Sequence, residues 1–254
     1  MTDLVLSHVD DGVQVIRINR PDKKNALIGE MYVALAEAFA RGEADPGVGV
    51  FLLVGSDTDF TAGNDLPDFL TWTSLSGSVA DGFIRAVAGA RKPVVAAVRG
   101  AAMGIGATLL PHCDLVYAAP GTRFLTPFIN LGIVPEAGSS MTLPQLAGHR
   151  RAAEMLLLGE PFDVDKALAI GLINAVVAGG ELEATAMAAA RKLAAKPRAT
   201  LLMIKALMKT PAEPIMDRLS RESAVFDDCL GRPELKEAVA AFTEKRPPDF
   251  SRCR

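Results

Sequence analysis

The fold class is decided by the stretch Pro93–Leu110, which reads PVVAAVRGAAMGIGATLL. Its first six residues form a continuous apolar run, which is typical of a strand buried on both faces of a sheet. A glycine-rich turn follows, and Gly104–Leu110 then forms an expected helix that Pro111 ends. A buried strand that leads through such a turn into a helix indicates an α/β core.

The flanking sequence extends this alternation of strands and helices and then becomes helical. Strands are expected at residues 4–9, 13–19, 49–55, 114–118 and 173–177, helices at 25–40 and 79–89, and a loop at 60–68. Later helices are expected at 139–147, 151–158, 163–169, 182–195, 199–208, 215–228 and 233–245. We therefore predict an α/β core domain in residues 1–195 and a helical region in residues 196–254.

The composition is unusually apolar, with 50% hydrophobic residues and a mean hydropathy of +0.24 over 254 residues. A membrane protein, a deep core or buried subunit contacts could each explain this excess. The longest uncharged piece of the most apolar region, Gly100–Pro111, is too short to span a bilayer. No signal peptide is visible at the N-terminus, so we expect a cytoplasmic protein without a membrane-spanning segment.

Charge and cysteine usage exclude two further classes of function. The net charge of −3 and the pI near 5.7 argue against nucleic-acid binding. The three cysteines and three histidines show no metal-ligand spacing, so we expect no metal site and reduced thiols.

Two glycine-rich turns, Phe60–Leu66 and Gly100–Gly106, each follow a buried strand. Glycine permits positive φ and lets the backbone approach a ligand closely. A dinucleotide fingerprint fails here, because the third glycine of that motif is missing after Gly106. Two readings stay open on the glycines alone: turns shaped for packing, or an oxyanion site made by backbone N–H groups of both turns.

The chain resembles the enoyl-CoA hydratase/isomerase (crotonase) family over nearly its whole length. The resemblance rests on five segments taken together: NRPDKKNAL (19–27), FTAGNDL (60–66), GAAMGIG (100–106), CDLVYA (113–118) and LGIVP (131–135). It implies a superhelix of repeated ββα units with C-terminal helices that pack a homotrimer or a dimer of trimers. It also implies an acyl-CoA thioester as substrate and no separate cofactor.

The resemblance also assigns residues to the site. Asn64 and Ile105 correspond to the residues whose backbone N–H groups bind the thioester oxygen. The other positions that it implies for substrate binding are Lys24, Asn25, Ala26, Ala62, Gly63, Asp65, Leu66, Gly104 and Phe128.

The acid/base residue distinguishes branches of this family. Hydratases use two glutamates, but this chain has Thr108 and Phe128 in their places, and neither can act as acid or base. Glu136 instead follows Pro135, where the ordinary pattern has glycine. This arrangement is similar to the peroxisomal type of Δ3,Δ2-enoyl-CoA isomerase, in which that single glutamate performs a 1,3-proton shift.

Three alternatives accompany this prediction. Glu136 could be only a first-turn acid that complements a helix dipole. Hydration, lyase chemistry or thioester hydrolysis through Glu136 is the nearest enzymatic alternative. An RNA-binding family member is the non-enzymatic one, and the acidic pI argues against it. From the sequence we also expect an apolar pocket of Phe60, Leu66, Phe69, Phe128 and Ile129, a capping role for Asp65 and a packing role for Thr108.

Overall fold

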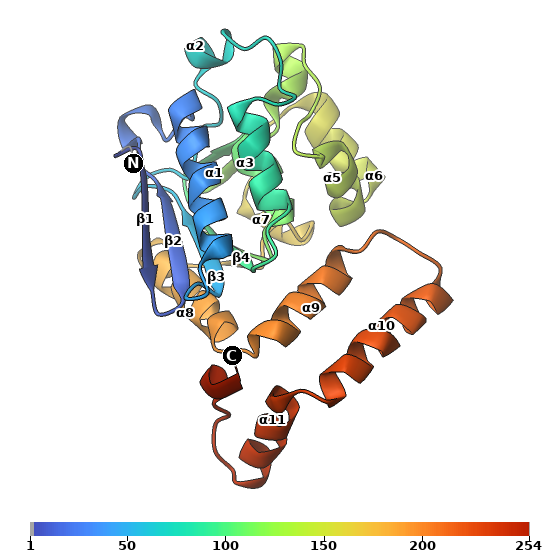
Figure 1. The fold of residues 1–254 in the computed structure, drawn as a ribbon. Helices are drawn as coiled ribbons and strands as arrows, with labels where there is room; N and C mark the ends of the chain where they lie inside the picture. The colour runs from blue at the N-terminus through green and yellow to red at the C-terminus, as the bar shows by residue number, and fades with distance from the viewer. Residues whose placement is uncertain (1–2, 254) are drawn as a thin grey trace. The chain divides into compact units, whose positions relative to one another are not determined.

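A mainly parallel sheet forms the framework of the computed structural model, which describes residues 3–253 (Figure 1). Within these residues the sheet has six strands in the order β1-β2-β3-β4-β6-β8. Their bounds are β1 (Val5–Asp10), β2 (Val13–Ile18), β3 (Val50–Val54), β4 (Val94–Val98), β6 (Leu115–Ala118) and β8 (Ala175–Val176). Only β1 and β2 pair antiparallel, so the α/β class predicted from the sequence is confirmed.

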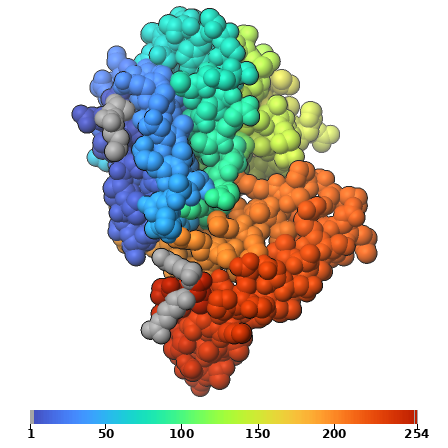
Figure 2. Space-filling model, in the orientation of Figure 1, coloured from blue at the N-terminus to red at the C-terminus, as the bar shows by residue number. Residues whose placement is uncertain are grey.

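The central strands are buried because helices cover the sheet. Every residue of β3 and β4 is buried, as their continuous apolar runs predicted. Helices α1 (Gly29–Ala44) and α3 (Val79–Ala88) pack against each other and form one closed surface in Figure 2. Phe39 of α1 packs against Phe51 of β3, with their ring centroids 4.7 Å apart. Burying one such side chain contributes about 1.5–3 kcal/mol, so this layer fixes the strands that lead to the site.

A second, two-stranded sheet was not predicted from the sequence. Strands β5 (Ala101–Met103) and β7 (Arg123–Leu125) pair in parallel. An isolated bridge between Thr61 and Ala102 connects the first glycine-rich turn to this sheet. Three-residue strands next to glycine are too short to show an alternating pattern, so only their pairing reveals them.

Several other elements begin or end at residues that differ from the predicted ones. The helix expected at residues 25–40 begins at Gly29, because Lys24 and Asn25 hold left-handed backbone angles with φ of +49° and +58°. The expected loop at residues 60–68 already contains the start of α2 (Leu66–Phe69). The helix expected at 151–158 is split into α6 (His149–Ala153) and a π-helical turn, η4 (Glu154–Leu158).

The remaining elements before residue 195 are short, apart from α8, which has 13 residues. They are η1 (Pro21–Lys23), α4 (Ile105–Thr108), η2 (Leu110–His112), η3 (Pro127–Leu131), α5 (Ser139–Ala147), α7 (Val164–Ala169), η5 (Gly179–Glu181) and α8 (Leu182–Ala194). No helix among residues 3–253 is long and apolar enough to cross a membrane.

The chain divides into two compact units, residues 1–191 and 192–254. The second unit holds α9 (Arg198–Lys209), α10 (Ile215–Leu230), α11 (Pro233–Thr243) and η6 (Phe250–Cys253). This division falls inside α8, whereas the sequence placed the domain boundary after residue 195. That domain boundary stays a prediction.

Candidate active site

The two glycine-rich turns approach each other so closely that side chains are excluded between them. A Cβ atom on Gly63 would lie 2.9 Å from the carbonyl oxygen of Met103, and one on Gly104 would lie 4.0 Å from Cα of Gly63. Both glycines have positive φ, +88° and +53°. Contact at this distance, together with these backbone angles, requires glycine at Gly63.

Asn64 pairs in parallel with Leu27, and this pairing directs the backbone N–H of Asn64 away from the Leu27 segment. Leu27 donates its N–H to the carbonyl of Gly63 at 2.8 Å, and Asp65 donates its N–H to the carbonyl of Leu27 at 2.9 Å. Because the residues on either side of Asn64 make these bonds, the alternation of the ladder turns the Asn64 N–H to the opposite side. Asn64 lies on the wall of a cavity there.

Ile105 is the first residue of α4 and lies on the same cavity wall. The first N–H groups of a helix have no acceptor within the helix. Those of Ala107 and Thr108 do find one, since both donate to the carbonyl of Gly104, at 2.9 and 3.0 Å. The N–H of Ile105, at the start of this helix, can serve an oxygen bound in the cavity, because Ile105 lines its wall. Two such donors on one oxygen would stabilise developing negative charge.

The cavity has a volume of about 490 Å³ and is mostly apolar. Its walls come from α1, the segment around α2, α3, the start of α4, η3 and the segment before α5. The lining residues are Tyr32, Asn64, Phe69, Leu70, Trp72, Thr73, Ser74, Leu75, Ala80, Ile84, Ile105, Phe128, Ile133, Val134, Pro135 and Glu136. The carboxylate of Glu136 therefore shares a mostly apolar cavity with residues of both turns.

Glu136 has the properties of an acid/base residue. Burial raises the pKa of Glu136 from 4.5 to about 7, against the opposing effect of a hydrogen bond from the Thr108 hydroxyl. Its second oxygen, Oε2, is buried and has no hydrogen-bond partner among the residues that the structure describes. A carboxyl group with a pKa near neutrality can both accept and return a proton. The sequence suggested only a packing role for Thr108. The structure shows that its hydroxyl also bonds to this carboxylate.

Tyr32 is a site residue that the sequence did not reveal. Its hydroxyl donates a hydrogen bond to Oδ1 of Asn64. Burial raises the pKa of Tyr32 well above 10, and the charges of Glu136 and Asp68 raise it further. The hydroxyl therefore stays protonated and remains a donor. The sequence could have indicated Tyr32, because it lies beside the apolar residues of α1 and a buried tyrosine hydroxyl usually has a hydrogen-bond partner.

The apolar wall differs from the one expected. Phe69 and Phe128 line the cavity as predicted, and Trp72 joins them. Phe60, in contrast, is fully buried in the core, while 55% of Leu66 and 48% of Ile129 are exposed. Phe60, Leu66 and Ile129 are therefore not part of the cavity wall.

Lys24, Asn25 and Ala26, which are expected to bind substrate, lie in a segment that hydrogen bonds hold in place. Asn25 is fully buried, and its side chain accepts from the N–H of Arg20 and donates to the carbonyl of Asp59, both at 2.7 Å. Ala62 donates its N–H to the carbonyl of Lys24 at 2.9 Å. The segment around Ala26 is thereby fixed beside the first turn. Contact of these residues with substrate stays a prediction.

Asp65 and Arg246 have partners of their own. Asp65 pairs with Arg20 at 2.7 Å and accepts from the N–H of Asp68 at 3.4 Å, so it caps α2 as predicted. Arg246 forms ion pairs with Glu237 and Glu244, each at 2.6 Å.

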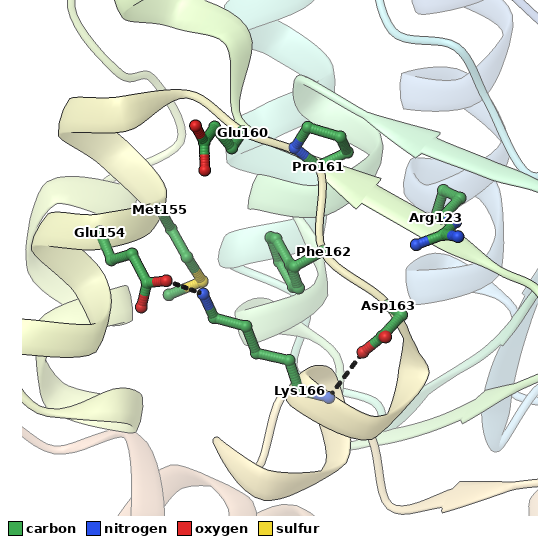
Figure 3. Close-up of a pocket in the computed structure, with 8 residues that line it drawn as sticks. All are labelled: Arg123, Glu154, Met155, Glu160, Pro161, Phe162, Asp163 and Lys166. Carbon is green, nitrogen blue, oxygen red and sulfur yellow. Dashed lines mark hydrogen bonds and ion pairs between the residues drawn. The ribbon is translucent and has the colours of Figure 1, made fainter.

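A second cavity, of about 210 Å³, lies between η4 and α7 (Figure 3). Lys166 pairs there with Glu154 at 2.9 Å, and Asp163 caps α7 through the N–H of Lys166 at 3.0 Å.

Across the described part of the chain, no group of three or more histidine, cysteine or acidic residues could hold a metal ion. The first cavity, with its raised carboxyl pKa and two backbone donors, is the candidate active site.

Comparisons with known proteins match the chain to one family. The family model described as enoyl-CoA hydratase/isomerase matches residues 8–252. The chain is 34% identical to the 1,2-epoxyphenylacetyl-CoA isomerase of Escherichia coli K12 over 99% of both chains, and 31% identical to the crotonyl-CoA hydratase of Syntrophomonas wolfei over 97% of both. A solved structure named "Putative enoyl-CoA hydratase/carnithine racemase", from Magnetospirillum magneticum AMB-1, is 80% identical. It covers 99% of this chain and 100% of its own, with a TM-score of 0.98.

Proposed function

The chain belongs to the enoyl-CoA hydratase/isomerase family, and we propose that it shifts a carbon–carbon double bond in an acyl-CoA thioester, from the 3-enoyl to the 2-enoyl form. The observation that carries the proposal is a single buried carboxyl group, Glu136, on the wall of the cavity that Asn64 and Ile105 also line. The coenzyme A thioester is the substrate, and no separate cofactor takes part.

The reaction needs one base that becomes one acid. Ionised Glu136 removes a proton from C2, and the negative charge spreads over a dienolate whose oxygen accepts from the N–H groups of Asn64 and Ile105. Protonated Glu136 then returns the proton at C4, and the double bond moves into conjugation with the thioester. No water is consumed, which suits an apolar cavity. Each backbone donor is worth roughly 10²–10³ in rate and the general base roughly 10²–10⁴.

Two positions argue against hydration. Thr108 and Phe128 stand where the resemblance places the two hydratase glutamates. Thr108 is fully buried and bonded to Glu136, and Phe128 is an apolar wall of the cavity. Neither can activate a water molecule, so one carboxyl group remains for a reaction that needs only one.

The test offers the purified protein a 3-enoyl-CoA and a 2-enoyl-CoA side by side. We expect conversion of the first to the 2-enoyl product and no 3-hydroxyacyl-CoA from the second. Hydration of the 2-enoyl-CoA at a comparable rate, or release of free coenzyme A, would refute the proposal. Glu136→Gln serves as the control that ties any turnover to this site.

A second candidate keeps the proton chemistry but changes the acyl group. The walls include four aromatic residues, Tyr32, Phe69, Trp72 and Phe128, and such a lining favours a ring. The Escherichia coli relative is named for 1,2-epoxyphenylacetyl-CoA, whose acyl group carries a ring. Comparing kcat/KM for ring-bearing and linear acyl-CoA substrates decides between the two. A preference for the linear substrate excludes this candidate.

We also propose that the chain assembles as a homotrimer or a dimer of trimers. Many apolar side chains of α9, α10 and α11 are exposed in the single chain, which is typical of surfaces that become buried in an assembly. They are Ile204, Met208, Ile215, Met216, Leu219, Phe226, Leu230, Leu235, Val239 and Phe242. Light scattering coupled to size-exclusion chromatography should give three or six times the chain mass of 26.8 kDa. A monomer would contradict the proposal.

A further inference from the structure

Thr108 lies between the oxyanion turn and the acid/base residue. Its side chain is fully buried at the end of α4. The hydroxyl Oγ1 lies 3.1 Å from the carbonyl oxygen of Gly104 and also within hydrogen-bond distance of Oε1 of Glu136. Two acceptors therefore compete for the one proton of this hydroxyl.

The charge of Glu136 decides this competition. A hydrogen bond to an ionised acceptor is roughly twice as strong as one between neutral groups, so the hydroxyl turns toward ionised Glu136. The carbonyl of Gly104 loses nothing essential, because it also accepts from the N–H groups of Ala107 and Thr108, at 2.9 and 3.0 Å. When Glu136 becomes protonated, the hydroxyl is free to turn toward Gly104.

The two oxygens of Glu136 thus have different surroundings. Oε1 is bonded to Thr108, whereas Oε2 is buried without a hydrogen-bond partner in the described chain. We propose that Thr108 is a positioning residue, which anchors Oε1 and so fixes the orientation of the Glu136 carboxyl group on the cavity wall. This inference rests on the proposed double-bond shift for its role in catalysis, but its physical content can be measured without turnover.

The other polar groups around Glu136 have separate partners. Tyr32, on α1, feels the charge of Glu136 but donates its hydroxyl to Asn64. On the chain that follows Glu136, Nε2 of His112 lies 2.7 Å from the carbonyl oxygen of Ala137. The hydrogen bond from Thr108 is the interaction that lowers the pKa of Glu136 against its burial. Removing this hydroxyl should therefore raise that pKa.

The test compares Thr108→Val, which keeps the shape of the side chain without its hydroxyl, with Thr108→Ser, which keeps the hydroxyl. The side-chain carboxyl carbons of glutamate are labelled with ¹³C, Glu136→Gln assigns the Glu136 signal, and the signal is followed through a pH titration. A hydrogen bond to a charged group typically contributes enough to shift a pKa by about one unit. We expect an upward shift of about one unit in Thr108→Val and values near wild type in Thr108→Ser.

The kinetic counterpart is the acidic limb of the pH profile of kcat/KM. It should move to higher pH in Thr108→Val by the same amount and be restored in Thr108→Ser. Thr108→Ala replaces Thr108→Val if the latter does not fold, as judged by its thermal transition. Equal titrations in wild type and in the variants without the hydroxyl, or equal shifts in the serine and valine variants, would overturn the inference.

The two proposals can fail separately. If the wild-type enzyme does not shift double bonds but the ¹³C titration moves as expected, the proposed function fails and the coupling of Thr108 to Glu136 stands. If turnover is confirmed and the titration does not move, the function stands and Thr108 is not its positioning residue.

Discussion

The hydroxyl of Tyr32 donates a hydrogen bond to the carboxamide oxygen of Asn64, and both residues lie on the wall of the candidate active-site cavity. Helix α1 therefore supports the first glycine-rich turn through this side-chain bond. The turn is held at three places: by pairing with Leu27, by contact with the second turn and by this side-chain bond. Donors fixed in this way need little reorganisation when charge develops.

Replacing Tyr32 with phenylalanine removes this bond but keeps the ring. We expect an unfolding free energy lower by about 1 kcal/mol, the usual contribution of one such bond. Activity should fall less than about tenfold, because the backbone N–H of Asn64 remains in place through its neighbours. Denaturant unfolding and initial rates measure both effects. An unchanged stability would show that the bond contributes nothing in solution.

Replacing Asn64 with alanine tests whether its side chain or its backbone serves the substrate. The N–H is retained, so we expect a small loss in kcat/KM, below about tenfold and similar to that of Tyr32→Phe. The double variant should lose no more than the worse single variant, because both remove the same bond. A loss above about a hundredfold in Asn64→Ala would mean that the carboxamide itself contacts the reacting atoms.

Replacing Glu136 with glutamine removes the proton carrier and keeps the shape of the side chain. A general base contributes roughly 10²–10⁴ in rate, so kcat/KM should fall by that factor. Stability should not fall at neutral pH, because an amide costs less to bury than a carboxylate. Activity on a 3-enoyl-CoA and the thermal transition check the two statements. Near-normal turnover would disprove the mechanism.

The pH dependence follows from the raised pKa of Glu136. The base must be ionised, so kcat/KM should rise with pH and level off above about 7, where Glu136 titrates. Stability should respond in the opposite direction. Folded Glu136 binds its proton up to about pH 7 and an unfolded one only to about 4.5, so between these values the folded state holds more protons and the free energy of unfolding declines as pH rises.

Glu136→Gln lacks this titrating group, and its stability relative to wild type isolates the effect. The wild type minus Glu136→Gln difference in unfolding free energy should decrease between pH 4.5 and 7, by at most about 3 kcal/mol, since one pKa unit corresponds to 1.36 kcal/mol. Urea unfolding at several pH values measures it. A difference that does not change with pH would mean that Glu136 titrates normally in the folded protein.

The close contact of the two turns can be tested with a pair of alanine substitutions. Gly63→Ala places a methyl group 2.9 Å from a backbone carbonyl at positive φ, so we expect lost activity and a stability lower by at least about 1 kcal/mol. Gly82→Ala is the matched control, because it lies in α3 with no atom within 4 Å of its new methyl group. It should stabilise the protein by about 0.5–1 kcal/mol. Equal effects of the two substitutions would argue against the contact.

Local patterns were sufficient for much of this fold. The apolar runs of β3 and β4 are fully buried as predicted, and α5 has the predicted bounds of 139 and 147. These elements can be predicted from the pattern of hydrophobic residues and from the prolines and glycines that mark the ends of elements. Both features depend on only a few neighbouring residues. Glu136, which the motif around Pro135 singled out, lies on the cavity wall, and its role as acid/base residue stays a prediction.

The sequence by itself thus determined the α/β class and the family resemblance, and it singled out Glu136 as the candidate acid/base residue. Only the tertiary structure decided what surrounds that group. The bond from Thr108 to Glu136 joins residues 28 positions apart, and that from Tyr32 to Asn64 joins residues 32 apart. The pairing of β5 with β7 and the placement of Trp72 on the cavity wall are equally non-local. A pKa near neutrality arises from such burial and contacts, which exist only once distant segments pack together.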